Sequence, residues 1–411
     1  MTHSSHTLFL LDVDGVLVHP VGYKNAMRAT VDHFTARMGQ AAMGPDNDEI
    51  AIFEACGLTN EWDSCAMCLS QLMLAALDQH PDLYRASLDE MVTAIQAANL
   101  ALPRPNFVAA ARRIHTSQAD GHFPAARYLK LIVDEIDPAH QPLFTTLLGN
   151  VYDVFGTPTT RVFQTYTLGS VRFADTYDQA APFESESMLA TQDVALLDAD
   201  HRDRLLAWDR ELQHGVTIYT ARPSLPPTDL PEPIPTAPMA GQTTGYAPEA
   251  ELAVDLLGVT GQIPLIGQGR VSWLAGQHGR GPGDYIKPSP VQALAGIGAA
   301  FSGTETDSLQ AAAALVERGE LIGPLAALRD HASADPTTTG QAVRVVVFED
   351  STGGIRATRA AVAHLTQMGI PAQCVAVGVS PHADKRAALQ EVADHVVDDI
   401  NAGLDLIWDR T

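Results

Sequence analysis

Two aspartates one residue apart, Asp12 and Asp14, carry the first chemical signal in this chain. They lie in residues 8–18, LFLLDVDGVLV, at the end of an apolar run, and a glycine directly follows the second. Such a run is typical of a buried strand that ends at a loop, where ligands bind in open α/β folds. We expect both carboxylates in a crevice, the first as a nucleophile or metal ligand and the second as an acid/base.

Three later segments also present polar side chains at the end of an apolar run or in a loop. Lys287 gains weight from the scarcity of lysine, since the chain has only four. The segments are residues 215–224 (GVTIYTARPS), where a β-branched run ends at Thr220, residues 286–290 (IKPSP), which present Lys287, and residues 343–356 (VRVVVFEDSTGGIR), where a buried run ends in Glu349 and Asp350.

In chain order, these four segments resemble the motifs of the haloacid dehalogenase (HAD) superfamily. The likeness is greatest to the phosphatase and phosphomutase branch, which carries a cap just after the first motif. Residues 374–380 and 393–400 resemble the last strands of that core. The resemblance implies an α/β fold: a Rossmann-like parallel sheet core from residues 1–20 and 205–411, and a large, mainly helical cap from residues 21–204 inserted after the first strand.

The resemblance also implies a role for each catalytic position. Asp12 would be the nucleophile that forms an aspartyl phosphate, which water then hydrolyses. Asp14 would protonate the leaving oxygen and later activate that water. Thr220 would donate a hydrogen bond to the transferring phosphoryl group, and Lys287 would hold that group and the nucleophile by charge.

A Mg²⁺ ion is the cofactor that the resemblance implies, because two anionic groups that face each other need a cation between them. Its expected ligands are the side chains of Asp12 and Asp350 and the backbone carbonyl of Asp14. Glu349 would contribute directly or through a water molecule.

We therefore expect a Mg²⁺-dependent phosphatase that acts on a small phosphorylated metabolite. A phosphomutase would use the same Asp12 and Asp14 and return the phosphoryl group to its substrate, so this alternative stays open. A non-catalytic ligand-binding or regulatory protein on the same fold is the second alternative, although a binder has no need of an acid/base at Asp14. Neither the physiological substrate nor the oligomeric state follows from the sequence.

The 411-residue chain has a formal charge of −23, which argues against nucleic acid and anionic membranes as partners. No apolar run approaches the ~18 residues of a membrane span. The start of the chain lacks a basic region before LFLL, so we expect a cytoplasmic protein without a signal peptide.

The cap region is predicted to be helical because Met27, Val31, Phe34 and Met38 recur at helical spacing. Residues 151–177 are rich in Thr, Tyr, Phe and Val, so irregular or extended pieces are expected there. Cys65 and Cys68 form a C-x-x-C on an apolar helix face, which favours buried small side chains over a metal site. Individual cap residues that contact substrate cannot be chosen from the sequence.

Past residue 204, helices and strands alternate, which indicates a parallel sheet with crossover helices. The Pro-rich segment 223–248 is predicted to be an extended surface loop, and residues 267–270 a tight turn. Helices are expected at residues 200–213, 249–257 and 290–300, and a further helical stretch at 308–329 decorates the core.

Overall fold

The computed structural model describes residues 6–117, 123–208, 214–234, 246–333 and 343–409, which form two compact units. Unit 1 contains the described residues of 6–20 and of 193–409, and unit 2 contains those of 21–192. The sequence predicts the second boundary at 204/205. Residues 193–204 instead belong to unit 1, because β3 (Val194–Ala195) pairs with β2 (Val18–His19) and Leu197 packs in the core of that unit.

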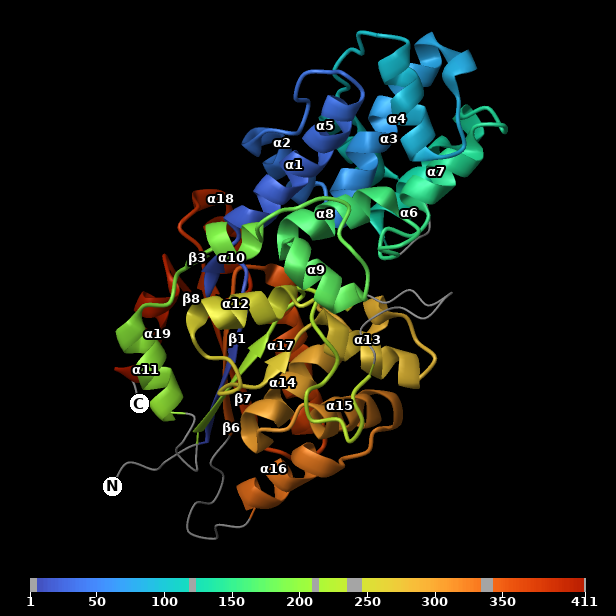
Figure 1. Ribbon diagram of the computed structural model, residues 1–411. Coiled ribbons are helices and arrows are strands. Elements are labelled where there is room, and N and C mark those ends of the chain that lie inside the picture. The colour runs from blue at the N-terminus through green and yellow to red at the C-terminus, as the bar shows by residue number, and fades with distance from the viewer. Residues whose placement is uncertain (1–5, 118–122, 209–213, 235–245, 334–342, 410–411) are drawn as a thin grey trace. The chain divides into compact units, whose positions relative to one another are not determined.

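Unit 1 is built on a six-stranded parallel sheet, which confirms the predicted α/β, Rossmann-like fold (Figure 1). The strand order is β5-β4-β1-β6-β7-β8, so the chain moves outward from β1 to one side and then, from β6, to the other. The strands are β1 (Thr7–Leu11), β4 (His214–Tyr219), β5 (Leu265–Ile266), β6 (Val343–Glu349), β7 (Ala372–Val379) and β8 (His395–Val397).

Both faces of this sheet are covered by helices. Side chains alternate along each strand, so apolar residues lie on both faces and each face needs a covering layer. Leu8 and Leu10 of β1 pack in one apolar cluster, whereas Phe9 and Leu11 pack in the other. On the first face lie α13 (Gln268–Gln277), α14 (Pro290–Ser302), α15 (Thr306–Arg318), α16 (Gly323–Ser333), α17 (Thr352–Gln367) and α18 (Ala383–Gln390), and on the second lie α11 (Ala199–Trp208), α12 (Glu249–Leu257) and α19 (Ile400–Trp408).

Two predictions about the helices of unit 1 need correction. The stretch 308–329 is two helices, α15 and α16, because Gly319 caps α15. Residues 267–270 are not a tight turn, since α13 begins at Gln268. Gly269 is needed there for packing: a Cβ would lie 1.8 Å from the backbone oxygen of Ser224.

The Pro-rich segment, described at residues 223–234 and 246–248, is not simply a surface loop. Pro223, Ser224, Pro226 and Pro227 are buried. Carboxylates of the core hold the segment through its backbone: Leu225 donates to Glu251 and Thr228 to Glu305. The prediction of a surface loop is therefore wrong for residues 223–227, and its middle lies outside the described residues.

Unit 2 is built mainly from helices in its described residues. Within 151–177, where irregular or extended pieces are expected, residues 151–157 are indeed irregular turns, whereas 158–168 and 170–177 are helical. Some of its helices begin at a side-chain cap: the Asn60 side chain accepts from Trp62 N at the start of the helix Glu61–Gln79. The helices are α1 (Val21–Arg37), α2 (Asn47–Ala55), α3 (Glu61–Gln79), α4 (Leu88–Ala97), α5 (Phe107–Thr116), α6 (Pro124–Ile132), α7 (Gln141–Leu148), α8 (Pro158–Leu168), α9 (Ser170–Tyr177) and α10 (Met188–Gln192), with 3₁₀ turns at Pro81–Leu83 and Val133–Glu135.

Helix α3 runs through the core of unit 2. Cys65 and Cys68 are completely buried on it, which confirms the predicted burial, and burial raises the pKa of both thiols. No described helix of the protein is long and apolar enough to cross a membrane.

Asp63, on the first turn of α3, is a carboxylate buried in unit 2. Its Oδ1 accepts from Ala125 N at 2.7 Å, while its Oδ2 has no hydrogen-bond partner among the residues that the structure describes. Burial raises its pKa to about 7, against the opposing effects of the Ala125 hydrogen bond and Arg127. The Asp63 carboxyl is therefore protonated more readily in the folded protein than in the unfolded chain.

A raised carboxyl pKa costs stability as the pH rises from the unfolded value towards the folded one. We expect Asp63→Asn, which mimics the protonated acid, to be more stable than wild type by an amount that grows between pH 4 and 7 and then levels off at about 2–4 kcal/mol. Denaturant unfolding followed by fluorescence measures the difference. The exposed Asp134→Asn should show no such trend, and a constant difference for Asp63→Asn would contradict the expectation.

Candidate functional site

Asp12 directly follows β1 at the carboxyl edge of the sheet. Its backbone N donates to Phe348 O at 3.1 Å, and its own Oδ1 accepts from Val13 N at 2.8 Å. The residue is only 6% exposed. Because the chain reverses its direction of progress across the sheet between β1 and β6, Asp12 lies at the switch point where ligands bind in such folds.

The loop after β1 turns at Gly15, which brings it against the loop after β6. Gly15 has a φ of +73°, and its N donates to Val18 O at 2.9 Å. A Cβ at this position would lie 2.6 Å from Asp350 Oδ2. Glycine is thus required both by the backbone conformation and by the approach of Asp350.

Lys287 places a buried cation between two carboxylates. Its Nζ lies 3.0 Å from Asp12 Oδ1 and 2.7 Å from Glu349 Oε1, and 4.3 Å from the ring centre of Tyr219. Only 8% of the Lys287 side chain is exposed. Burial lowers its pKa, but the charges of Asp12 and Glu349 outweigh this effect and raise the pKa above its usual value.

Glu349 is completely buried and both its oxygens have donors. Oε1 accepts from Tyr219 Oη at 2.7 Å as well as from Lys287, and Oε2 accepts from Ser351 Oγ at 2.9 Å. Burial and then Asp12 raise the pKa of Glu349, and Lys287 opposes them. The contacts make Glu349 the counter-ion of Lys287, while its predicted contribution to a metal site stays a prediction.

Asp350, the next residue, is the first residue after β6 at the same edge of the sheet. Its Oδ2 accepts from Lys385 Nζ at 2.6 Å, and its side chain is 17% exposed. Burial raises its pKa to about 6, Lys385 lowers it and Asp12 raises it. Lys385 belongs to α18, just beyond the carboxyl end of β7.

Asp12, Glu349 and Asp350 each offer one oxygen within 4.8 Å of the others, and in the described part of the chain this is the one such group of three or more His, Cys, Asp or Glu. A hard cation such as Mg²⁺ prefers oxygen ligands and retains several waters, so this donor set fits it. Because both Glu349 oxygens already accept hydrogen bonds, Asp12 and Asp350 fit the ion better.

Asp14 is paired with Arg222, which the sequence interpretation missed. Arg222 Nε and Nη2 donate to Asp14 Oδ1 at 2.9 and 2.6 Å, and Nη2 also donates to Asp193 Oδ2 at 3.1 Å. The Arg222 side chain is 1% exposed and that of Asp14 is 35% exposed. A basic residue three positions beyond the end of β4 was the available signal, but neither partner is near it in sequence.

Thr220 follows β4, next to β1 in the sheet, and is 1% exposed. Its Oγ1 accepts from Arg222 N at 3.2 Å, and its backbone oxygen accepts from Gln292 Nε2 at 2.8 Å. The structure thus places Thr220 at the predicted edge, in contact with the loop that carries Arg222.

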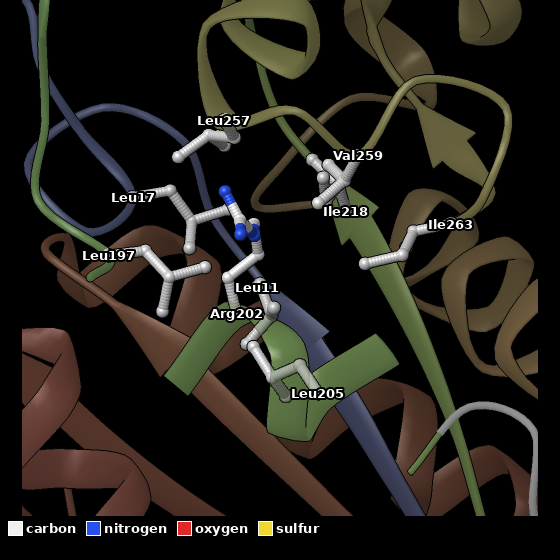
Figure 2. A pocket seen from close by; sticks show the side chains of 9 residues that line it. All are labelled: Leu11, Leu17, Leu197, Arg202, Leu205, Ile218, Leu257, Val259 and Ile263. Atoms are coloured by element: carbon white, nitrogen blue, oxygen red, sulfur yellow. The ribbon is translucent and has the colours of Figure 1, made fainter. Parts of the chain in front are cut away.

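A small hollow elsewhere in unit 1 does not take part in this arrangement (Figure 2). It holds about 10 Å³, close to one water-sized sphere. Apart from Arg202, its lining is aliphatic: Leu11, Leu17, Leu197, Leu205, Ile218, Leu257, Val259 and Ile263. With no carboxylate or hydroxyl in its lining, it is a packing defect of the core.

Comparison with known proteins supports the fold of this chain but says nothing about its chemistry. No family model matches the chain, and no curated protein matches it. An X-ray structure of a structural genomics target, ZR25 of the Northeast Structural Genomics Consortium, is similar over 98% of this chain and 99% of its own, with a TM-score of 0.61 and 16% identity. Phosphatase Tt82 from Thermococcus thioreducens aligns over 77% of this chain and 92% of its own, with a TM-score of 0.32 and 15% identity.

Removing the buried cation should expose how strongly the cluster depends on it. We expect Lys287→Met to lower the free energy of unfolding by about 3–5 kcal/mol, because two buried carboxylates lose their counter-ion. Adding Glu349→Gln should recover part of this loss, and denaturant titration measures both. Arg318→Met, which breaks a surface pair with Glu320, should cost no more than about 1 kcal/mol. Equal losses in the single and double variants would contradict this coupling.

Proposed function

We propose that this protein is a Mg²⁺-dependent phosphatase of the HAD superfamily that hydrolyses a small phosphorylated metabolite through an aspartyl phosphate. The observation that carries the proposal is the contact of Lys287 with Asp12, at the sheet edge where Asp350 also lies. The order of the motifs along the chain supports it. Asp12, Thr220 and Asp350 follow strands of one parallel sheet, and Lys287 lies just before the helix α14, which packs on that sheet.

In this mechanism, Asp12 attacks the phosphorus through a carboxylate oxygen. Lys287 keeps the attacking group in place and neutralises charge on the phosphoryl oxygens, as its fixed position between Asp12 and Glu349 allows. Asp14 gives a proton to the leaving oxygen and then takes one from the water that attacks the aspartyl phosphate. Thr220 donates to a phosphoryl oxygen.

The proposed Mg²⁺ would be held by the side chains of Asp12 and Asp350 and the backbone carbonyl of Asp14, and would offset the repulsion between carboxylates and substrate. Glu349 acts chiefly through Lys287. Unit 2 is proposed as the cap that selects the substrate, because all the motif residues belong to unit 1.

Metal removal tests the first part of the proposal. We expect hydrolysis of phosphate monoesters to stop on exhaustive chelation and to return with Mg²⁺, because Asp12, Asp350 and the phosphate otherwise repel each other. Asp12→Asn should abolish turnover, while circular dichroism shows the same fold. The exposed Asp134→Asn serves as the matched control and should keep its activity. Undiminished turnover in the chelated enzyme would exclude the metal.

Asp14→Asn tests the acid/base assignment and separates the alternatives. The amide can neither donate nor accept the required proton, so kcat should fall by about 10²–10⁴-fold or more while substrate still binds. Steady release of inorganic phosphate by wild type supports the phosphatase. Conversion of one phosphorylated isomer to another with little free phosphate would indicate a mutase. A wild type that binds such a ligand without turnover, and an Asp14→Asn variant that binds equally well, would indicate a non-catalytic protein.

A further inference from the structure

Arg222 is held more firmly than an ordinary surface arginine. Its backbone N donates to Thr220 Oγ1 at 3.2 Å, and its backbone oxygen accepts from Gln268 N at 3.0 Å. The loop after β4 is thereby fixed to the start of α13, with the guanidinium buried. Since the backbone and the planar group are both anchored, the group has a defined direction.

The guanidinium contacts the two oxygens of Asp14 unequally. The single N–H of Nε is shared between Oδ1 at 2.9 Å and Oδ2 at 3.0 Å, whereas Nη2 donates to Oδ1 alone, at 2.6 Å. Oδ1 is therefore the anchored oxygen. Oδ2 accepts from Arg222 only through the shared Nε–H, so it is the oxygen of this partly exposed carboxyl that Arg222 engages less.

The second partner of Arg222, Asp193, belongs to the return of the chain into unit 1. It directly precedes β3, which pairs with β2 through Val18 and Ala195. Asp14 lies four residues before β2 and forms a bridge with Val18. Arg222 thus ties together the two segments at the base of the β2–β3 ribbon, through which the chain leaves and re-enters unit 1.

We propose that Arg222 is a positioning residue that holds Asp14 by Oδ1 so that Oδ2 carries the transferred proton, and that Asp193 in turn fixes Arg222. This inference rests on the proposed phosphatase. In the first step, the Asp12–phosphorus bond forms, the bond from phosphorus to the leaving oxygen breaks, and that oxygen takes the proton from Asp14 Oδ2. In the second, water attacks the aspartyl phosphate, its proton returns to Oδ2, and Asp12 is released with inorganic phosphate.

The role of Arg222 can be measured with two substrates that differ in their need for an acid. p-Nitrophenolate can leave without being protonated, whereas the alkoxide of an alkyl phosphate needs a proton in order to leave. We compare kcat/KM because it covers only the steps up to the first phosphoryl transfer. With Arg222→Met, we expect kcat/KM to fall by about 10²-fold or more for the alkyl phosphate and by less than about 10-fold for p-nitrophenyl phosphate. Arg222→Lys should recover part of the alkyl loss, and Asp193→Asn should show the same selective loss to a smaller extent.

Arg270→Met is the matched control, because Arg270 is the other deeply buried arginine in the described part of unit 1 and pairs with Glu251 and Glu305. Its loss should affect both substrates equally. If Arg222→Met lowered kcat/KM equally for the alkyl phosphate and for p-nitrophenyl phosphate, and Arg222→Lys recovered nothing, the positioning role would be overturned while the proposed phosphatase activity would stand. A wild type that hydrolyses neither ester would overturn the proposed function itself. If Arg222→Met fails to fold, Arg222→Lys and Asp193→Asn decide the question: each should lose more kcat/KM for the alkyl phosphate than for p-nitrophenyl phosphate.

Discussion

The ammonium group of Lys287, enclosed between Asp12 and Glu349, is the interaction on which the rest of the site depends. Moving one cation and two carboxylates out of water is costly, and their mutual attraction offsets this cost only when the geometry and the remaining hydrogen bonds are good. Here Tyr219 and Ser351 complete the shell of Glu349, and a Cβ on Gly354 would lie 1.8 Å from Glu349 Oε1. The start of α17 therefore has to approach the carboxylate closely, which only glycine permits.

The parallel sheet supplies the second constraint, because it brings the carboxyl ends of β1, β4 and β6 to one edge. Asp12, Thr220 and Glu349 come from segments more than a hundred residues apart in sequence, yet they end neighbouring strands. Two further cations reach this edge from outside the strands, Arg222 from the loop after β4 and Lys385 from α18. Rigid strands thus fix the central groups, and loops and helices add the surrounding ones.

The sequence was sufficient to predict the sheet and the strand-end residues, because the apolar runs of β1 and β6 are buried and end in charge. Asp12 and Asp350 could be found in this way, whereas Lys287 lies in a loop before α14 and was found from its motif and the scarcity of lysine. Arg222 could not be found, since its partners Asp14 and Asp193 are brought to it only by the folded β2–β3 ribbon. The second domain boundary was predicted at the wrong residue for a related reason. A two-residue strand such as β3 leaves no periodic pattern in the sequence, and only its pairing with β2 decides to which unit it belongs.

The charge balance at this edge links the structure to the chemistry proposed for it. Five carboxylates meet there, and the three basic side chains beside them each contact at least one of these: the acids are Asp12, Asp14, Asp193, Glu349 and Asp350, and the bases are Lys287, Arg222 and Lys385. A phosphate monoester would add further negative charge to a site whose formal balance is already negative, in a chain of net charge −23. The site therefore needs positive charge beyond its own lysines and arginine, and the oxygens of Asp12 and Asp350 are suited to a divalent cation that would supply it. This is why we propose Mg²⁺ as part of the active protein, with Lys287 fixing the nucleophile and Arg222 the acid.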